Sequence, residues 1–300
     1  MKAGKEIVVS QYRITRRGFL AAAGVVLVGR VSLASDETAA STRWALVADT
    51  HVTATDTTGN PPSNHHYFDP LGNTERIMAA IAADPGAGVI IGGDLARTNG
   101  QPGDYRSLAD RVALLPKNCP VFMALGNHDH RENFRSVFKK VPGMLVPVED
   151  KHITVIDSPP VRFIVLDSLR KVNESGGELG PLQLAWLKDF LVAGGPPTLI
   201  ALHHTLGASG GITDVEAFFS AISPARCVKG VIYGHSHVHR YGARDGIQLI
   251  NVPAAGYSFD ELIAIGWIDA ALTAVGGRFR MNTTAGPVPR NAVQELTWRA

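Results

Sequence analysis

Five short apolar runs in this chain each end in a cluster of aspartate, asparagine or histidine side chains. The runs are four or five residues long and rich in Val, Ile and Leu, which is typical of strands buried in a sheet. The polar cluster after each run therefore marks the place where a strand leaves the core. The five junctions are residues 44–48 before Asp49-Thr50-His51, 88–91 before Gly93-Asp94, 121–125 before Gly126-Asn127-His128-Asp129, 198–202 before His203-His204, and 230–233 before Gly234-His235-Ser236-His237.

Helical patterns fill the gaps between several of these runs. Residues 74–83, 104–115 and 181–192 place apolar side chains at helical spacing, and 213–222 fits a shorter helix. Residues 163–166 fit one more buried strand. Strands that alternate with helices indicate an α/β fold. The last apolar runs have no helices between them and predict an antiparallel second sheet or hairpins; these runs are 248–252, 263–268 and 278–281.

The polar clusters have the composition of a metal site. In open α/β sheets, the crevice beyond the carboxyl ends of the strands is the usual place for a ligand. Carboxylate, amide and imidazole groups together suit Zn²⁺, Mn²⁺ or iron better than Ca²⁺. Asp49 with His51, and His235 with His237, are i,i+2 pairs, which share one side of an extended backbone. We therefore expect each pair to supply two ligands to one place.

The order and spacing of the clusters resemble the calcineurin-like metallophosphoesterase superfamily. The resemblance covers residues 44 to about 240. It implies a four-layer α/β/β/α sandwich that holds two adjacent metal ions, and iron, manganese and zinc all suit the ligands. By motif, Asp94 bridges the two ions. The resemblance assigns Asp49, His51 and His237 to the first ion, and Asn127, His203 and His235 to the second.

The resemblance also implies a hydrolase that acts on phosphoric ester bonds. Two dications neutralise the anionic phosphate, and a metal-bridging hydroxide attacks phosphorus. His128 is then the acid/base group beside the metals, with Asp129 behind it to orient the imidazole. We expect a phosphodiester substrate, and a phosphomonoesterase or nuclease with the same metal centre is the alternative. A non-catalytic metal-binding protein is a third hypothesis, which the presence of Asp94 and His128 disfavours.

Neighbouring residues favour the diesterase branches of the family. Arg97 stands where purple acid phosphatases carry the tyrosine that gives them their colour, and Asp129 stands where protein serine/threonine phosphatases have glutamate. Residues 167–168, 177–180 and 183–187 resemble segments of bacterial class III cyclic-nucleotide and glycerophosphodiester phosphodiesterases.

Two choices stay open in the sequence. His203 fits the motif of the family, but His204 is an alternative ligand, and Thr205 stands where the family usually has proline. Cys119 and Cys227 each precede an apolar strand. They can pair in an oxidising compartment or remain free, buried thiols.

Other side chains can reach the substrate from outside the five clusters. His65 and His66 lie on a loop that either roofs the site or is a solvated surface loop. Arg97 and Arg131 each lie three positions after an assigned aspartate or histidine and can meet a phosphate. We expect Arg97 to pair with a carboxylate instead.

The first 34 residues have the features of an export signal. The segment Thr15-Arg16-Arg17-Gly18-Phe19-Leu20 resembles the twin-arginine motif, and the apolar run that follows is too short for a stable bilayer span. We expect residues 1–34 to be a twin-arginine signal peptide and residues 35–300 to form a single metallophosphoesterase domain. An N-terminal membrane anchor is the alternative.

The charge of the chain is concentrated in this leader. Residues 1–34 contain six basic residues and one acid, a net +5. Because the whole chain has a formal charge of +2, residues 35–300 carry −3, and the basic balance does not support a nucleic-acid partner. We expect a small phosphate-ester substrate, no nucleic-acid partner, no stable membrane span after cleavage, contact with the twin-arginine export machinery, and a periplasmic or secreted location.

Overall fold

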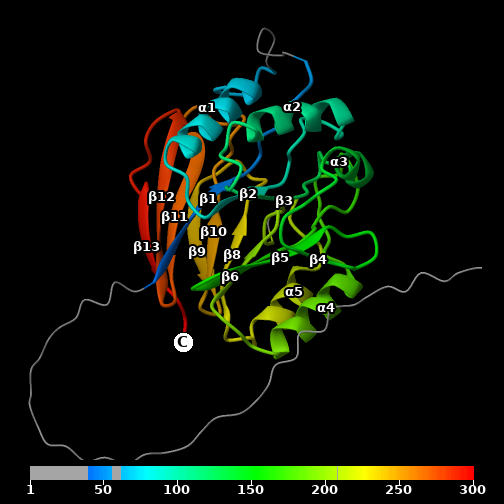
Figure 1. The fold of residues 1–300 in the computed structure, drawn as a ribbon, viewed down its shortest axis with the longest axis vertical. Coiled ribbons are helices and arrows are strands. Elements are labelled where there is room, and N and C mark those ends of the chain that lie inside the picture. Colours follow the sequence, from blue (N-terminus) through cyan, green and yellow to red (C-terminus); the bar gives the residue numbers. More distant parts are fainter. Residues whose placement is uncertain (1–39, 56–61, 208) are drawn as a thin grey trace, which may run out of the picture. The chain divides into compact units, whose positions relative to one another are not determined.

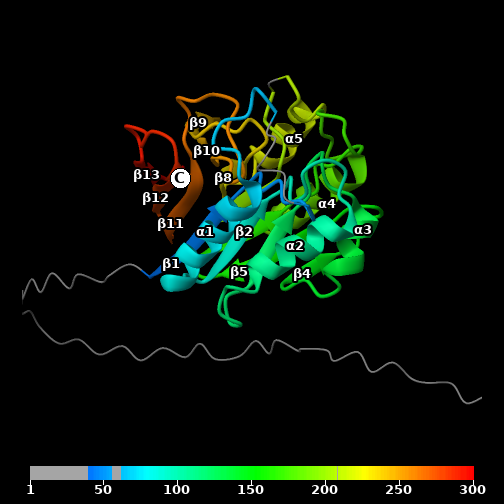
Figure 2. The same ribbon diagram turned by 90° about the horizontal axis from the view of Figure 1, so that it is seen from above.

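The computed structural model describes residues 40–55, 62–207 and 209–300. The expected signal peptide, residues 1–34, lies outside the described residues. Two mixed β-sheets pack face to face, and helices cover both outer faces (Figures 1 and 2). This arrangement confirms the expected α/β/β/α sandwich.

The first sheet has six strands in the order β13-β12-β11-β1-β2-β3. In one half of this sheet, β1 (Ser41–Val47), β2 (Gly88–Gly92) and the outermost strand β3 (Val121–Ala124) run parallel, so their carboxyl ends lie at one edge. The antiparallel strands beyond β1 are β11 (Ile265–Thr273), β12 (Gly276–Ala285) and β13 (Val293–Thr297).

The second sheet has seven strands in the order β4-β5-β6-β7-β8-β10-β9. Its parallel centre consists of β6 (Val161–Val165), β7 (Thr198–Ala201), β8 (Val228–Tyr233) and β10 (Ile247–Asn251). The antiparallel edge strands are β4 (Met144–Val146), β5 (Ile153–Ser158) and β9 (Arg240–Arg244).

The core between the sheets is built on large apolar side chains from both. Trp44 of β1 is 2% exposed and packs on Phe163 of β6, with ring centroids 4.9 Å apart. Phe122 of β3 lies against the same indole. Truncating such a buried tryptophan to alanine costs about 3–5 kcal/mol. The contact therefore fixes the spacing of the two sheets whose edges carry the polar clusters.

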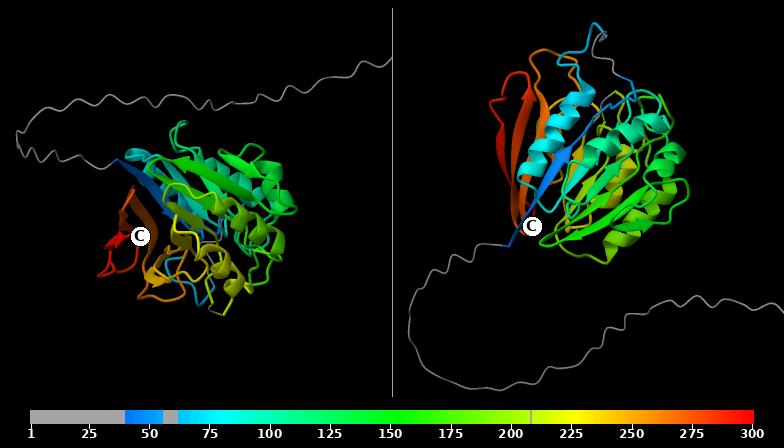
Figure 3. Two further views of the ribbon diagram at one scale, coloured as in Figure 1. Left: turned by 90° about the horizontal axis from the view of Figure 1, so that it is seen from below. Right: turned by 45° about the horizontal axis from the view of Figure 1, so that its top comes forward.

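Helices α1 (Pro70–Ala83) and α2 (Pro102–Val112) cover the outer face of the first sheet (Figure 3). Helix α1 begins after Asp69, whose carboxylate accepts a hydrogen bond from the Gly72 amide. Proline suits the first turn because no donor is needed there. Both helices form near their predicted positions, with ends shifted by a few residues.

Helices α4 (Pro181–Val192) and α5 (Val215–Ile222) cover the outer face of the second sheet. Leu187, Leu191 and Phe218 supply fully or nearly fully buried contacts there. No helix in the part of the chain that the structure describes is long and apolar enough to cross a bilayer.

The prediction of hairpins for the last apolar runs is confirmed, whereas a separate antiparallel sheet does not form. β10 forms a hairpin with β9 and pairs in parallel with β8 on its other side, so it belongs to the second, mixed sheet. β11 and β12 form a hairpin that extends the first sheet beside β1. The sequence also misses the short helix α3 (Arg131–Val137) and the edge strands β9 and β13, because the two strands have no buried residue and none of the three segments contains an apolar run.

Cys119 is buried and Cys227 is half-buried, and both are free thiols. They lie just before β3 and β8, which belong to different sheets. The sequence left open whether the two cysteines form a disulfide or remain free, and in the structure they remain free.

Candidate metal centre

The polar clusters of both sheets meet at one edge of the sandwich. Carboxylates from the first sheet lie beside imidazoles from the second, and the shared members Asp49 and Asp94 link neighbouring groups. The groups whose ligand atoms lie within 4.8 Å of one another are Asp49/His51/His237, Asp49/Asp94/His203, His51/Asp94/His128 and His203/His204/His235.

The first group surrounds the end of β1. His237 donates its Nδ1 hydrogen to the Tyr257 carbonyl oxygen, 2.9 Å away, because that oxygen can only accept. Its Nε2 therefore presents a lone pair, which lies 3.5 Å from Asp49 Oδ1 and 3.1 Å from His51 Nε2. Two ring nitrogens and a carboxylate thus face one point.

The second group is built in the same way around Asp94. His203 donates its Nδ1 hydrogen to the Gly92 carbonyl oxygen at 2.9 Å. Its Nε2 lies 3.3 Å from Asp94 Oδ2 and 3.2 Å from His235 Nδ1. Burial disfavours a charged imidazole, but the Asp94 carboxylate outweighs it and raises the pKa of His203 to about 9. A positive charge, whether a proton or a metal ion, is favoured between the two side chains.

Neighbouring groups are in the form that binds metals. Burial lowers the pKa of His51 to about 3 and that of His235 to about 4, so both imidazoles are neutral near pH 7. Burial alone would raise the pKa of Asp94, yet the imidazole of His203 holds it well below its ordinary value. The amide oxygen of Asn127 is buried without a hydrogen-bond partner among the described residues. The residues present therefore fit a centre of metal ions.

The backbone is strained at the same side chains. Asp49, His51, Asp94, His235 and His237 all have positive φ angles, between 46° and 69°. Non-glycine residues adopt this region uncommonly, and such strain concentrates at functional sites.

The expectation that each i,i+2 pair shares one side of an extended backbone is wrong about the backbone, and its consequence holds for the first pair only. The left-handed turns replace extended backbone at these positions. Asp49 and His51 do lie together, but His235 joins His203 whereas His237 joins Asp49. The two histidines of the second pair therefore belong to different groups of candidate ligands.

Two glycines allow the clusters to approach one another. A Cβ atom on Gly126 would lie 2.2 Å from Asp94 Oδ1, and one on Gly234 would lie 2.5 Å from Asp49 Oδ2. Neither position has room for a side chain. The close approach of the loops depends on these glycines.

A family model of calcineurin-like phosphoesterases matches residues 42–239. This chain belongs to the calcineurin-like phosphoesterase family. The match covers about two thirds of the chain and includes the whole candidate centre.

One relative is similar in sequence, and two solved structures are similar in fold. The chain is 30% identical to the 3′,5′-cyclic adenosine monophosphate phosphodiesterase CpdA of Vibrio vulnificus, over 57% of this chain and 65% of that protein, which is slightly less than two thirds of its length. A dimetal phosphatase from Danio rerio has a similar fold, with a TM-score of 0.65, 14% identity, and coverage of 86% of this chain and 99% of that one. The purple acid phosphatase PPD1 of yellow lupin also has a similar fold, with a TM-score of 0.62 and 14% identity. The match covers 86% of this chain and 54% of that one. At these identities, the structural likeness shows the fold alone.

Asp129 does not orient His128, in contrast to the expectation from this family. Its buried carboxylate instead accepts hydrogen bonds from the amides of Leu95, Ala96 and Gly126, at 3.2, 3.1 and 2.9 Å. Burial raises the pKa of Asp129 to about 7, although the three amides lower it. Asp129 therefore ties the loop after β2 to the loop after β3, and its action on the centre is indirect.

Two other acceptors orient His128. Its Nδ1 lies 2.7 Å from the Thr98 carbonyl oxygen and 3.2 Å from Asn173 Oδ1, so this nitrogen carries the hydrogen and Nε2 is free to exchange a proton. The main chain of Asn173 also donates to the Asn127 carbonyl at 2.7 Å. Sequence reasoning misses Asn173, because a single asparagine in a loop gives no periodic or motif signal.

The structure places His203 and His204 differently. His203 lies against Asp94, as described above. His204 Nδ1 is 2.8 Å from the Ser168 hydroxyl, and its buried Nε2 has no hydrogen-bond partner in the described ranges. Burial lowers the pKa of His204 to about 2. His203 is thus the one that shares a carboxylate with the other candidate ligands.

The two arginines considered from the sequence are both engaged by other side chains. Arg131 forms a bidentate pair with buried Asp167, at 2.7 and 2.9 Å. Arg97 has its guanidinium 4.7 Å from the centroid of the Phe68 ring, and no carboxylate of the described chain pairs with it. The expected pairing of Arg97 with a carboxylate is therefore wrong.

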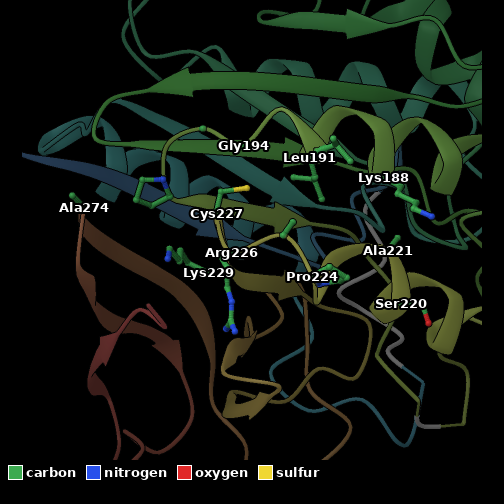
Figure 4. Close-up of a pocket in the computed structure, with 14 residues that line it drawn as sticks. Lys188, Leu191, Gly194, Ser220, Ala221, Pro224, Arg226, Cys227, Lys229 and Ala274 are labelled. Carbon is green, nitrogen blue, oxygen red and sulfur yellow. The ribbon is translucent and has the colours of Figure 1, made fainter.

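A cavity of about 650 Å³ lies elsewhere, between α4, α5 and the amino ends of β7 and β8 (Figure 4). Its wall is mostly apolar, with Leu191, Ala221 and Pro224 among its lining residues. None of the candidate ligands lines it, so it belongs to the end of the sheet opposite the candidate metal centre.

Proposed function

We propose that this protein is a phosphodiesterase that works with two metal ions. The observation that carries this proposal is the pairing of buried ring nitrogens with buried carboxylates. Nε2 of His203 and Nε2 of His237 lie beside Asp94 and Asp49, and because each Nδ1 donates to a backbone carbonyl, Nε2 is the nitrogen that is left to bind a proton or a metal ion. A lone pair beside a buried carboxylate is repulsive unless a cation lies between them. Divalent metal ions satisfy both partners at once.

The proposed ligand set follows the two halves of the cluster. Asp94 is the shared ligand, since it lies near both His51 and His203. When bound, the two ions neutralise the phosphate, orient it and lower the pKa of water between them. Asp49, His51 and His237 would hold the first ion, and Asn127, His203 and His235 would hold the second.

His128 supplies the proton chemistry in this proposal. Nδ1 keeps its hydrogen on Thr98, so Nε2 is the nitrogen that faces the substrate. From there it can stabilise a phosphoryl oxygen or protonate the departing alkoxide. The His128 amide also donates to Asp94 Oδ1 at 2.9 Å, which fixes the imidazole relative to the shared ligand.

A cyclic nucleotide is the substrate class that we propose first. The support is the similarity to CpdA of Vibrio vulnificus, whose name specifies cyclic adenosine monophosphate. Glycerophosphodiesters, phosphomonoesters and nucleic acids are the competing classes, since the same metal centre can act on each of them.

A substrate panel tests the proposed function. The mature protein should be reconstituted with iron, manganese or zinc and assayed with cyclic AMP, a glycerophosphodiester, bis-p-nitrophenyl phosphate and p-nitrophenyl phosphate. We expect hydrolysis of diesters together with about two metal ions per chain. Preference for the monoester, or metal content near zero after gentle purification, would contradict the proposal.

We also propose that the enzyme is exported as a folded, metal-loaded protein, with residues 35–300 as its single domain. The support is the twin-arginine motif at Arg16 and Arg17 and the short apolar run after it. Cell fractionation should find the protein in the periplasm or medium. Replacing both arginines by lysine should retain it in the cytoplasm, and unchanged export would contradict this route.

A further inference from the structure

Aromatic rings gather beside the first half of the metal centre. Tyr257 lies under His51 and His237, with ring centroids 4.8 and 4.7 Å away. Phe259 lies 4.6 Å from the ring of His237, and His65 lies 4.1 Å from Tyr257. These rings therefore lie in contact with the proposed metal ligands, and the proposed mechanism uses none of the three added side chains.

The backbone holds this aromatic group in place. His66 and Ser258 exchange two main-chain hydrogen bonds, at 2.7 and 2.9 Å, which join the loop of His65 to the loop of Phe259. The Tyr257 carbonyl accepts the hydrogen of His237 Nδ1. The rings are thus preorganised relative to the proposed metal ligands, and little ordering is needed when a ligand arrives.

One ring of the group is open to solvent. Phe259 is 50% exposed, whereas Tyr257 beneath it is only 6% exposed. An exposed phenylalanine packed against a candidate metal ligand contributes less to stability than a buried one, yet it offers a flat apolar face to a bound molecule. Base–aromatic stacking of this kind is common in nucleotide-binding proteins.

The charge near the rings separates two kinds of ligand. An aromatic group of this type can also hold a quaternary ammonium ion. Here the Arg97 guanidinium already lies 4.7 Å from the centroid of Phe68, whose ring is 5.5 Å from Tyr257 and 5.6 Å from His65. A second cation would be repelled, whereas a neutral, planar ring would not.

We propose that Phe259, with His65 and Tyr257, forms a subsite for a flat, uncharged aromatic group such as a nucleobase, carried by a phosphate ester bound at the metal centre. This inference rests on the proposed function. It makes Phe259 a specificity-determining residue, since a glycerophosphodiester has no ring to stack.

The test compares Phe259→Ala with the wild-type holoenzyme on two substrates, cyclic AMP and glycerophosphocholine. We expect the KM for cyclic AMP to rise about tenfold with kcat within about twofold, because stacking on one ring is removed. The kcat/KM for glycerophosphocholine should stay within about twofold. Phe259→Tyr should restore the wild-type KM for cyclic AMP. Leu262→Ala is the matched control, since Leu262 is a 76% exposed apolar residue three positions along the same loop.

Binding of products gives a second readout that does not need turnover. Calorimetry of the metal-loaded protein should find 5′-AMP bound about tenfold more tightly than ribose 5-phosphate, and Phe259→Ala should abolish this difference. Equal affinity for the two ligands in the wild type would overturn the subsite. So would a Phe259→Ala variant that loses glycerophosphocholine activity as much as cyclic AMP activity, or more.

The two proposals fail in different ways. If the wild type hydrolyses diesters but 5′-AMP and ribose 5-phosphate bind equally, the subsite is wrong and the diesterase stands. If no diester is hydrolysed but 5′-AMP binding still depends on Phe259, the diesterase is wrong and the subsite stands.

Discussion

The two sheets contribute different chemistry to the same centre. The first sheet supplies the oxygen donors Asp49, Asp94 and Asn127, with one imidazole from His51. The second sheet supplies imidazoles only. These second-sheet residues are His203, His235 and His237. The second sheet offers no oxygen donor, and the first offers only one imidazole among the proposed ligands, so the full mixed set that iron, manganese or zinc favours forms only where the sheets meet.

This division means that metal binding should join the two sheets. An ion held by Asp49 and His237, or by Asp94 and His203, is a bridge across the sandwich edge, in addition to the apolar contacts of Trp44. Anything that binds the folded state and not the unfolded state stabilises the fold. Substitutions in either sheet therefore test this division of the metal ligands.

The largest effect is expected from Asp94→Ala, which removes the shared oxygen donor of the first sheet. Both ions should be lost, and kcat should fall by more than about 100-fold, since even residues that only support metal ligands cost 10–100-fold. Elemental analysis and thermal unfolding with and without chelator measure the loss of metal, and steady-state kinetics measure the fall in kcat. The variant should show no difference in Tm on chelation. Asp110→Ala on the exposed face of α2 is the control, and an Asp94→Ala protein that retains two ions would refute the shared role.

The next effect separates two neighbouring histidines of the second sheet. His203→Ala should lose about one metal ion per chain and most activity, because its Nε2 lies against Asp94. His204→Ala should keep two ions and lose stability through its bond with Ser168. The metal content of the His203→Ala and His204→Ala variants decides which histidine is the ligand. The reverse result would make His204 the ligand.

A smaller effect on binding, with a large effect on turnover, is expected from His128→Ala. This side chain lies beside His51 and Asp94 and is proposed to move a proton. Both ions should remain, while kcat falls by about 10²–10⁴-fold, as is typical for loss of a general acid. Steady-state kinetics measure the fall in kcat, and metal analysis measures the number of ions retained. Full activity in this variant would contradict the proposed role of His128.

The smallest effect is expected at Asn173, which orients His128 from a loop outside both sheets. Asn173 has a φ of 62°, so Asn173→Gly removes the side chain without backbone strain. We expect kcat to fall about tenfold with KM and metal content unchanged. Asn173→Asp retains an acceptor for Nδ1 and should recover most of the loss. Equal kcat in the glycine variant would leave Thr98 as the only orienting group.

Sequence reasoning succeeds where a pattern is local. The strands that end at Asp49, Asp94 and His203 follow from short apolar runs, and the clusters after them are read directly from their order. The same reasoning does not place β10 in its sheet, because an apolar run does not specify its partners: β10 pairs in parallel with β8 as well as in a hairpin with β9.

Several site details depend on distant parts of the chain. Asp129 is adjacent to His128 in sequence, yet its carboxylate turns to the amides of the loop after β2, since burial requires those donors. Asn173 reaches His128 from a loop 45 residues away in the sequence, and Phe259 reaches His237 from another loop. No pattern in either loop points to this.

The sequence by itself determined the strand–helix alternation, the motif set from Asp49 to His237 and the family that carries it, because these are short-range features of the chain. Only the tertiary structure decided which donors come together around one candidate metal position, which acceptors orient His128, and which aromatic ring beside His237 is exposed to solvent. The physical reason is that hydrogen bonding, burial and charge act through space. They are settled when the two sheets bring their edges together.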